Sequence, residues 1–254
     1  MFTMPGKLEL DMLPQPDDAT CGPTCLQALY RYYGDDIPLP QVIGEVSALD
    51  EGGTLAVLLG CHALRRGYQA SIITYNLTIF DPTWFSIDQF TSESDQTESL
   101  EICPRANALI GRLQAQMAAK NSAKLRAASQ AYIDFLRLGG EIRTHELNSG
   151  LLRRYLNRSV PILTGLSSTY LYQCMRETEF VGEPDDVRGV PTGHFVVLSG
   201  YDKQQRTVSV ADPYLPNPLG QTHYYEVGFD RIIVAILLGV LTYDANLLII
   251  EPRD

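Results

Sequence analysis

The chain has 254 residues, of which 45% are hydrophobic and 20% charged, values that indicate a folded globular protein able to bury a full core. Its formal net charge of −10 argues against nucleic acid or an anionic membrane as a partner. Residues 1–13 lack a basic stretch followed by an apolar one, so no signal peptide is expected. The longest apolar run, at 232–241, is about half of the 20 residues that a membrane span requires.

The five cysteines are an odd number and lack the spacing of a disulfide framework. We therefore expect a reducing compartment and a cytoplasmic location. Cys21 and Cys25 do not form a CxxC pair, and with at most one histidine nearby they would make a poor zinc site. We expect neither a metal nor a cofactor.

Residues 15–25, Gln-Pro-Asp-Asp-Ala-Thr-Cys-Gly-Pro-Thr-Cys, place Cys21 where a loop becomes a helix. Thr20 is a capping-type residue, and Pro23 suits a first helical turn, where its missing N–H costs nothing. A thiol in that turn feels the positive end of the helix dipole, which favours the nucleophilic thiolate. Gln15 precedes Cys21 by six positions, and its side-chain amide could donate to an oxyanion beside the thiol.

Most cysteines inside cells are inert core residues and not nucleophiles. We keep that interpretation for three of the five: Cys25, Cys61 and Cys174. Cys103 has no evident partner. For Cys21 the nearby glutamine, the glycine that follows it and the helix start favour the nucleophile.

The segment after this helix predicts short helices at 38–47 and 54–66 and a strand at 68–75. Residues 77–145 then depart from the pattern on either side. Within them, residues 91–101 carry four acidic side chains and almost nothing apolar, and an alanine-rich stretch with helical spacing follows. We expect 91–101 to be a loop or a mobile lid. We expect 77–145 to be a loop and helical insertion, whose role is either packing alone or selection of the substrate.

The last hundred residues are rich in β-forming side chains. We expect helices at 151–156 and within 232–241, and strands at 160–165, 193–198, 207–211, 224–227 and 245–250. Helices early and antiparallel strands late predict an α+β fold in which N-terminal helices pack on a C-terminal antiparallel sheet. We expect residues 1–254 to form a single catalytic domain that carries the insertion at about 77–145.

His194 opens the run Gly-His-Phe-Val-Val-Leu, and Asp212 follows the return strand of the same hairpin. Because the start of one hairpin strand lies beside the end of the other, we expect the Asp212 carboxylate to face His194 and orient its imidazole. Asp202 is the rival carboxylate, but it lies at the turn. The remaining histidines fit core or exposed polar positions: His62, His145 and His223.

These motifs resemble those of the papain-like cysteine peptidases, in particular the bacterial bacteriocin-processing, or double-glycine, branch. The resemblance covers the spacing from glutamine to cysteine, Cys-Gly-Pro at a helix start, the later Gly-His-Phe-Val-Val-Leu-Ser-Gly-Tyr-Asp and the Ala-Asp-Pro. It implies a papain-like fold with Gln15 as oxyanion-hole donor, Cys21 as nucleophile, His194 as general base and acid, and Asp212 as the orienting residue.

Many members of that branch are the N-terminal part of a membrane exporter with an ATP-hydrolysing domain. This chain shows no glycine-rich loop ending in Lys-Ser or Lys-Thr, and it is much longer than the compact family core. We therefore expect a free-standing, soluble relative with a peptide or protein substrate, and no ATP-hydrolysing domain in this chain.

The sequence thus predicts a thiol hydrolase that cleaves a peptide or isopeptide bond through a thioester on Cys21. Two alternatives stay open. An acyltransferase or amidase would use the same thioester, because the outcome depends on which acceptor reaches it. A peptide-binding relative with a decayed site would belong to a different class, although the presence of all four residue types counts against it.

Overall fold

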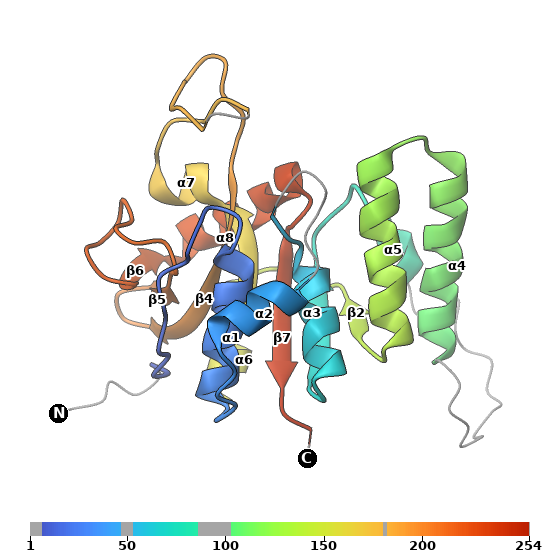
Figure 1. Ribbon diagram of the computed structural model, residues 1–254, viewed down its shortest axis with the longest axis horizontal. Coiled ribbons are helices and arrows are strands. Elements are labelled where there is room, and N and C mark those ends of the chain that lie inside the picture. The colour runs from blue at the N-terminus through green and yellow to red at the C-terminus, as the bar shows by residue number, and fades with distance from the viewer. Residues whose placement is uncertain (1–6, 47–52, 86–102, 180–181, 254) are drawn as a thin grey trace.

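The computed structural model describes residues 7–46, 53–85, 103–179 and 182–253. Its centre is a twisted seven-stranded sheet with the order β2-β1-β7-β3-β4-β5-β6 (Figure 1). The strands are β1 Gln69–Thr74, β2 Glu141–Arg143, β3 Ile162–Ser167, β4 Gly193–Asp202, β5 Thr207–Ala211, β6 Tyr224–Gly228 and β7 Asn246–Glu251. All neighbouring strands are antiparallel except β1 and β2, which are parallel.

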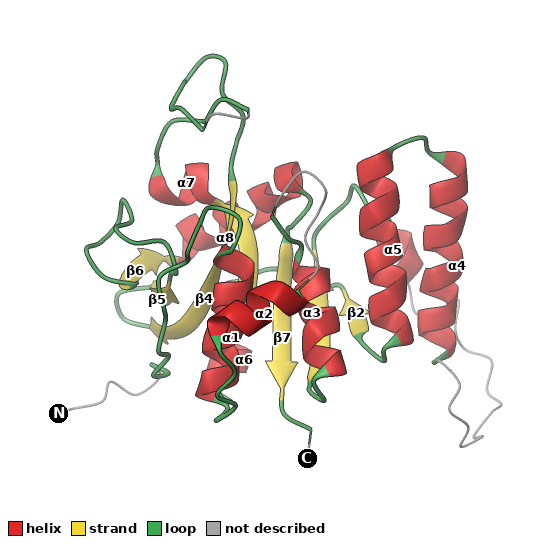
Figure 2. Cartoon of the chain, in the orientation of Figure 1, coloured by secondary structure: helices red, strands yellow, loops and turns green. Residues whose placement is uncertain are grey.

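Helices surround this sheet (Figure 2). They are α1 Cys21–Tyr32, α2 Leu39–Glu45, α3 Ala56–Arg65, α4 Pro104–Ala119, α5 Ala123–Arg137, α6 Ser149–Leu156, α7 Ser168–Tyr172 and α8 Phe229–Leu238, with 3₁₀ turns η1 Pro82–Phe85 and η3 Gly239–Thr242. The predicted α+β class is confirmed, and N-terminal helices α1 and α3 do pack on the sheet.

The central strands β3, β4 and β7 are buried on both faces of the sheet, and alternate side chains of β4 enter different cores. Phe195 and Val197 of β4 join the core that contains α1 to α5. Val196 and Leu198 enter the second core, which α6 and α8 cover. A strand buried on both faces shows an unbroken apolar run, which explains the sequence after His194.

The sheet differs from the expectation at its first edge. β1 and β2 precede the other strands in the sequence, and their pairing is parallel, with Ile72 opposite Ile142. β2 has only three residues, too few to show an alternating pattern, so the sequence did not predict it. β3 is a central strand, and Pro161 lies just before its first residue, where no ladder hydrogen bond is lost.

Helices α4 and α5 form an antiparallel pair beyond the β2 edge of the sheet (Figure 1). Phe135 of α5 packs against α3, since a Cβ added at Gly60 would lie 2.6 Å from its ring. The helical part of the 77–145 segment therefore shares the core of the N-terminal helices. The predicted acidic loop at 91–101 lies outside the described residues. Within the described part of the chain, no helix has the length and apolar character needed to cross a membrane.

Candidate active site

Cys21 is the first residue of α1. Thr20 occupies the N-cap, but its hydroxyl donates to the carbonyl of Asp17 at 3.0 Å and makes no capping hydrogen bond to the helix. Pro23 has no N–H to satisfy. The Thr20 side chain therefore does not accept a hydrogen bond from the free N–H groups at the start of α1. The thiol of Cys21 lies beside these groups, at the positive end of the helix dipole.

Close packing fixes the position of this helix start. A Cβ at Gly22 would lie 2.6 Å from the Thr54 methyl and 3.2 Å from the Phe195 ring, so α1 approaches β4 more closely than a larger residue would permit. One turn later, the Cys25 thiol donates to the Phe195 carbonyl at 3.3 Å. Burial raises the pKa of Cys25 well above its usual value, and this thiol is a fully buried structural residue as predicted.

His194 contacts Asp212 through one ring nitrogen. Nε2 of His194 lies 2.8 Å from Oδ1 of Asp212, and both side chains are buried. The Cys21 thiol lies close enough to the His194 ring to raise its pKa, and both side chains line the same cavity. Because Asp212 occupies Nε2, the nitrogen that meets the thiol is Nδ1. The imidazole therefore bridges a thiol and a carboxylate, with Nε2–H donated to the carboxylate.

Three influences set the charge of this imidazole. Burial lowers the pKa of His194, but the hydrogen bond and charge of Asp212, followed by those of Cys21, outweigh it and raise the pKa to about 10. Burial opposes ionisation of Asp212, yet its hydrogen bonds, led by the one from His194, hold its pKa below the usual range. The arrangement favours an imidazolium beside the Asp212 carboxylate.

Gln15 lies on the loop before α1, half buried. Its backbone N–H donates to the carbonyl of Pro213 at 2.9 Å, and its Nε2 donates to the carbonyl of Asp17 at 2.9 Å. Its Oε1 is buried without a hydrogen-bond partner in the structure. Gln15 is not among the residues that line the cavity beside Cys21, and its role as an oxyanion donor stays a prediction.

Asp212 has further partners that the sequence did not suggest. Its Oδ2 accepts hydrogen bonds from the hydroxyls of Tyr172 at 2.7 Å and Tyr225 at 2.6 Å. Its Oδ1 also accepts from the backbone N–H of Tyr214 at 2.9 Å. Tyr225 lies on β6, next to the strand that ends just before Asp212, and this neighbourhood is the signal that could have found it. Tyr172 follows β3 and had no such signal.

A small cavity of about 210 Å³ opens beside Cys21 and His194. It is lined by the start of α1, the loop before α3, α5, β3, β4 and η3: Asp18, Ala19, Cys21, Gly53, Thr54, Leu55, Lys124, Gly165, Leu166, Gly193, His194, Phe195, Thr242 and Asp244. A Cβ at Gly165 would lie 2.7 Å from the Asp244 carboxyl carbon, and one at Gly193 would lie 2.7 Å from Oγ1 of Thr242. Both glycines therefore allow Asp244 and Thr242 to pack closely at the wall of the cavity, where a larger side chain would displace them.

Asp244 is a second buried carboxyl in this cavity. Its Oδ2 accepts from the backbone N–H of Ala56 at 2.9 Å, at the start of α3, and its Oδ1 accepts from Asn246 Nδ2 at 2.6 Å. Burial raises the pKa of Asp244 to about 7, against the opposing effect of these hydrogen bonds. The carboxyl thus caps α3 and can be neutral near neutral pH.

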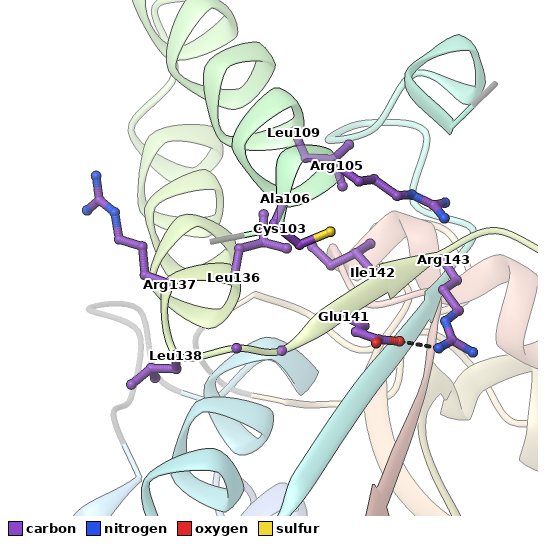
Figure 3. Close-up of a pocket in the computed structure, with 12 residues that line it drawn as sticks. Cys103, Arg105, Ala106, Leu109, Leu136, Arg137, Leu138, Glu141, Ile142 and Arg143 are labelled. Carbon is purple, nitrogen blue, oxygen red and sulfur yellow. Dashed lines mark hydrogen bonds and ion pairs between the residues drawn. The ribbon is translucent and has the colours of Figure 1, made fainter. Parts of the chain in front are cut away.

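A larger cavity of about 590 Å³ lies elsewhere, between the start of α4, the end of α5 and β2 (Figure 3). Figure 3 shows Arg105 and Arg143 on one side of it, while Arg137 points away from them. Arg143 pairs with Glu141, and the Arg105 guanidinium lies over the Phe85 ring. Neither Cys21 nor His194 lines this cavity, so its size does not make it the candidate active site.

The structure separates the remaining candidates from the site. Asp202 lies at the far end of β4, where it accepts from the N–H groups of Gln204 and Gln205. His62 is buried, with its ring between the Tyr30 hydroxyl and Glu45, as expected of a core residue. Cys174 was predicted to be a core residue, and this is wrong. It lies just after α7 and is exposed.

Comparison with known proteins gives a match to a family model over part of the chain and solved structures of low similarity. Residues 115–231, a little under half of the chain, match the model of the Peptidase_C39 like family. This segment contains His194 and Asp212 but begins after Cys21. It agrees with the family indicated by the sequence motifs, and this part of the chain is similar to the C39-like peptidases. No curated protein matches the sequence.

The similar solved structures include three examples, all at low identity. A double glycine motif protease from an AMS/PCAT transporter, in complex with the leader peptide, is 12% identical with a TM-score of 0.43, over 98% of this chain and 96% of that one. The peptidase domain of Streptococcus ComA is 11% identical with a TM-score of 0.42, over 96% and 100%. Xylellain, a cysteine protease from Xylella fastidiosa, is 15% identical with a TM-score of 0.45, over 99% and 88%.

Proposed function

We propose that the protein hydrolyses a peptide or isopeptide bond through a thioester on Cys21. The observation that carries this proposal is the position of His194, whose ring is hydrogen-bonded to the Asp212 carboxylate and lies close to the Cys21 thiol. The thiol and the imidazole also line one cavity, so a bound carbonyl could reach both. This geometry provides a nucleophile, a proton carrier and a group that orients the carrier.

The reaction follows from these roles. The Cys21 thiolate adds to the carbonyl carbon, and the resulting oxyanion is stabilised by the Gln15 amide and the N–H groups at the start of α1. The His194 imidazolium gives its proton to the leaving amine, which departs and leaves the thioester. Neutral His194 then takes a proton from a water molecule, which attacks the thioester carbonyl. The carboxylic acid product leaves, and the Cys21 thiolate and the His194 imidazolium are regenerated.

Residues 77–145 are proposed as an insertion into a single catalytic domain. Lys124 of α5 lines the cavity that contains Cys21, which supports a role for this segment in substrate selection. The family match starts inside the segment, at residue 115. The bacterial source, the cytoplasmic location and the peptide substrate likewise remain proposals.

Thiol reactivity tests the proposed nucleophile directly. Cys103 and Cys174 are exposed, whereas Cys21 is only 8% exposed, so accessibility alone would favour the first two. Brief treatment with iodoacetamide at pH 6, followed by mass spectrometry, should nevertheless label Cys21 first. Cys103→Ser and Cys174→Ser variants should keep the fast phase, and Cys21→Ser should lose it. If Cys103 or Cys174 is labelled first, the proposal is wrong.

Hydrolysis and acyl transfer can be separated once Cys21 is acylated by an activated ester. Adding a primary amine at increasing concentration measures how the thioester partitions between water and amine. Hydrolysis as the dominant path predicts that free acid remains the main product at millimolar amine. An amide as the main product would instead favour the acyltransferase, and no acylation at all would favour the peptide-binding relative.

A further inference from the structure

Asp212 is completely buried, and four hydrogen bonds surround its carboxylate. One oxygen receives His194 and the Tyr214 backbone, and the other receives the hydroxyls of Tyr172 and Tyr225. A carboxylate oxygen accepts about two hydrogen bonds in good geometry. Both carboxylate oxygens therefore accept as many hydrogen bonds as they can. Any rotation of the Asp212 side chain would break hydrogen bonds to three different elements of the fold.

The two tyrosines come from separate parts of the fold. Tyr172 ends α7, which follows β3 directly, and Tyr225 lies on the edge strand β6. Across the β5–β6 pair, Tyr225 lies opposite Val210, two residues before Asp212, so it is on the same face of the sheet as that carboxylate. The two hydroxyls donate to the same oxygen of this carboxylate. They form one polar cluster on Oδ2.

Both phenols act only as donors to this carboxylate at ordinary pH. Burial, followed by the charge of Asp212, raises the pKa of Tyr172 and of Tyr225 far above the usual value, so neither ionises. Hydrogen bonds to the charged form of an acid favour that form. Besides the one from His194, the bonds from Tyr225 and Tyr172 hold the pKa of Asp212 down.

We propose that Tyr172 and Tyr225 are positioning residues, whose hydroxyls keep Asp212 ionised and fixed so that His194 presents Nδ1 to Cys21. The inference rests on the proposed function of these three groups. It predicts that losing the two hydroxyls weakens the imidazolium, because Asp212 would be protonated at a higher pH and could rotate. A packing role alone would lower stability without changing the titration of the site.

Other groups that face Asp212 set the background for this titration. From α1 this is the thiol of Cys25, and from β4 the imidazole of His194. From the segment before β6 it is His223, whose Nδ1 lies 2.7 Å from the backbone oxygen of Asp212. The turn after β5 contributes only the backbone N–H of Tyr214. The Cys25 thiol stays neutral, because burial raises its pKa. Replacing tyrosine by phenylalanine therefore changes the donors to Asp212 and leaves the nearby charges in place.

The test measures the rate of Cys21 alkylation by iodoacetamide from pH 4 to pH 9. The variants are Tyr172→Phe, Tyr225→Phe and their combination, with Tyr33→Phe as the matched control. Tyr33→Phe also removes a hydrogen bond made by a tyrosine hydroxyl, the 2.8 Å bond to the carbonyl of Ile250, but this bond lies far from Asp212. The pH midpoint should rise in both single variants and most in the double one, with a loss of about tenfold or more in rate at pH 5.

Repeating the tyrosine substitutions in an Asp212→Asn variant tests whether their effect depends on the charge of Asp212. In Asp212→Asn the midpoint should already be raised, and adding Tyr172→Phe or Tyr225→Phe should move it no further. Circular dichroism and thermal unfolding verify that each variant is folded, and the single variants serve if the double one is not.

The outcomes separate this inference from the proposed function. If the parental Cys21 reacts no faster than Cys103 or Cys174, the proposed function fails whatever the tyrosines do. If Cys21 reacts fast and the single and double phenylalanine variants titrate like the parent, only the positioning role is overturned. A shift of equal size in Tyr33→Phe would also overturn it, because the effect would then follow from stability alone.

Discussion

The backbone N–H of Gln15 donates a 2.9 Å hydrogen bond to the carbonyl of Pro213. This bond joins the loop before Cys21 to the turn that begins with Asp212. The two segments are almost 200 residues apart in the sequence, yet together they bring Gln15, the nucleophile loop and the carboxylate turn into one region. The hydrogen bond to Pro213 therefore holds the backbone of Gln15 in place.

Replacing this glutamine tests its proposed role at the oxyanion. Gln15→Ala should slow acylation of Cys21 by an activated ester by roughly 10²–10³, the usual cost of one lost oxyanion donor. The backbone bond to Pro213 remains in the variant, so the fold should be intact. Gln41→Ala, which removes an exposed helical glutamine bonded to Glu45, is the control and should leave the rate unchanged. A parental rate in Gln15→Ala would assign oxyanion binding to backbone N–H groups alone.

The charge of His194 should make stability depend on pH. Its pKa in the folded protein, about 10, lies above the unfolded value near 6.5. A group of this kind stabilises the fold fully below its unfolded pKa, and the stabilisation is lost as the pH rises through 10. The difference in free energy of unfolding between the parent and His194→Gln should therefore be largest near pH 6 and shrink by pH 10.5. Urea titrations at both pH values measure it, and a difference independent of pH would contradict the imidazolium.

The two glycines of the cavity should control access of a substrate to Cys21. A methyl group at Gly193 would meet the end of the Thr242 side chain, and one at Gly165 would meet both the side chain and the backbone oxygen of Asp244. Gly193→Ala should reduce acylation by a peptide ester by about tenfold and leave alkylation by iodoacetamide unchanged, because only the larger reagent fills the cavity.

Gly165→Ala should have the same effect on acylation and also lower stability by about 1–3 kcal/mol, since backbone cannot move aside easily. Gly111→Ala is the matched control, because a Cβ there meets nothing within 4 Å. Equal losses with the ester and with iodoacetamide would show that the glycines affect the thiol itself and not the cavity.

Asp244 should also make stability fall with rising pH, but in a lower pH range than His194. Burial raises its pKa in the folded protein to about 7, above the unfolded value near 3.9, so the fold loses stability as the pH rises from 4 to 7. Asp244→Asn keeps an acceptor for the Ala56 N–H and removes the charge. Relative to the parent it should gain about 2–4 kcal/mol between pH 4 and pH 8, as measured by urea unfolding. A constant difference would mean that Asp244 ionises at its ordinary pKa.

Local sequence was enough to predict the main elements near the site. Cys21 opens α1 because a loop of polar residues and Pro23 precede an apolar helical pattern, and this is local information. The strand after Gly193 was predicted from an unbroken run of β-forming side chains. The cysteine peptidase class likewise followed from a few short motifs, and the family match supports it.

Register, in contrast, was decided by the tertiary structure. β4 and β5 pair with a bulge between Leu198 and Gly200, which inserts one extra residue into β4. Beyond the bulge Ala211 lies opposite Val197, so the next position, Asp212, is in line with Val196 and on the same face as His194. Without the extra residue every side chain beyond that point would change face, and Asp212 would turn away from the imidazole.

The sequence by itself therefore determined which residue types stand at the start of a helix and at the ends of two strands. It could not determine that Tyr172 and Tyr225 meet at Asp212, that Cys174 is exposed or that Asp244 enters the cavity beside Cys21. Helix starts and strands depend on neighbouring residues, which the sequence lists in order. Contacts between α7, β6 and the turn after β5 depend on how distant segments pack, and only the assembled sheet sets those distances.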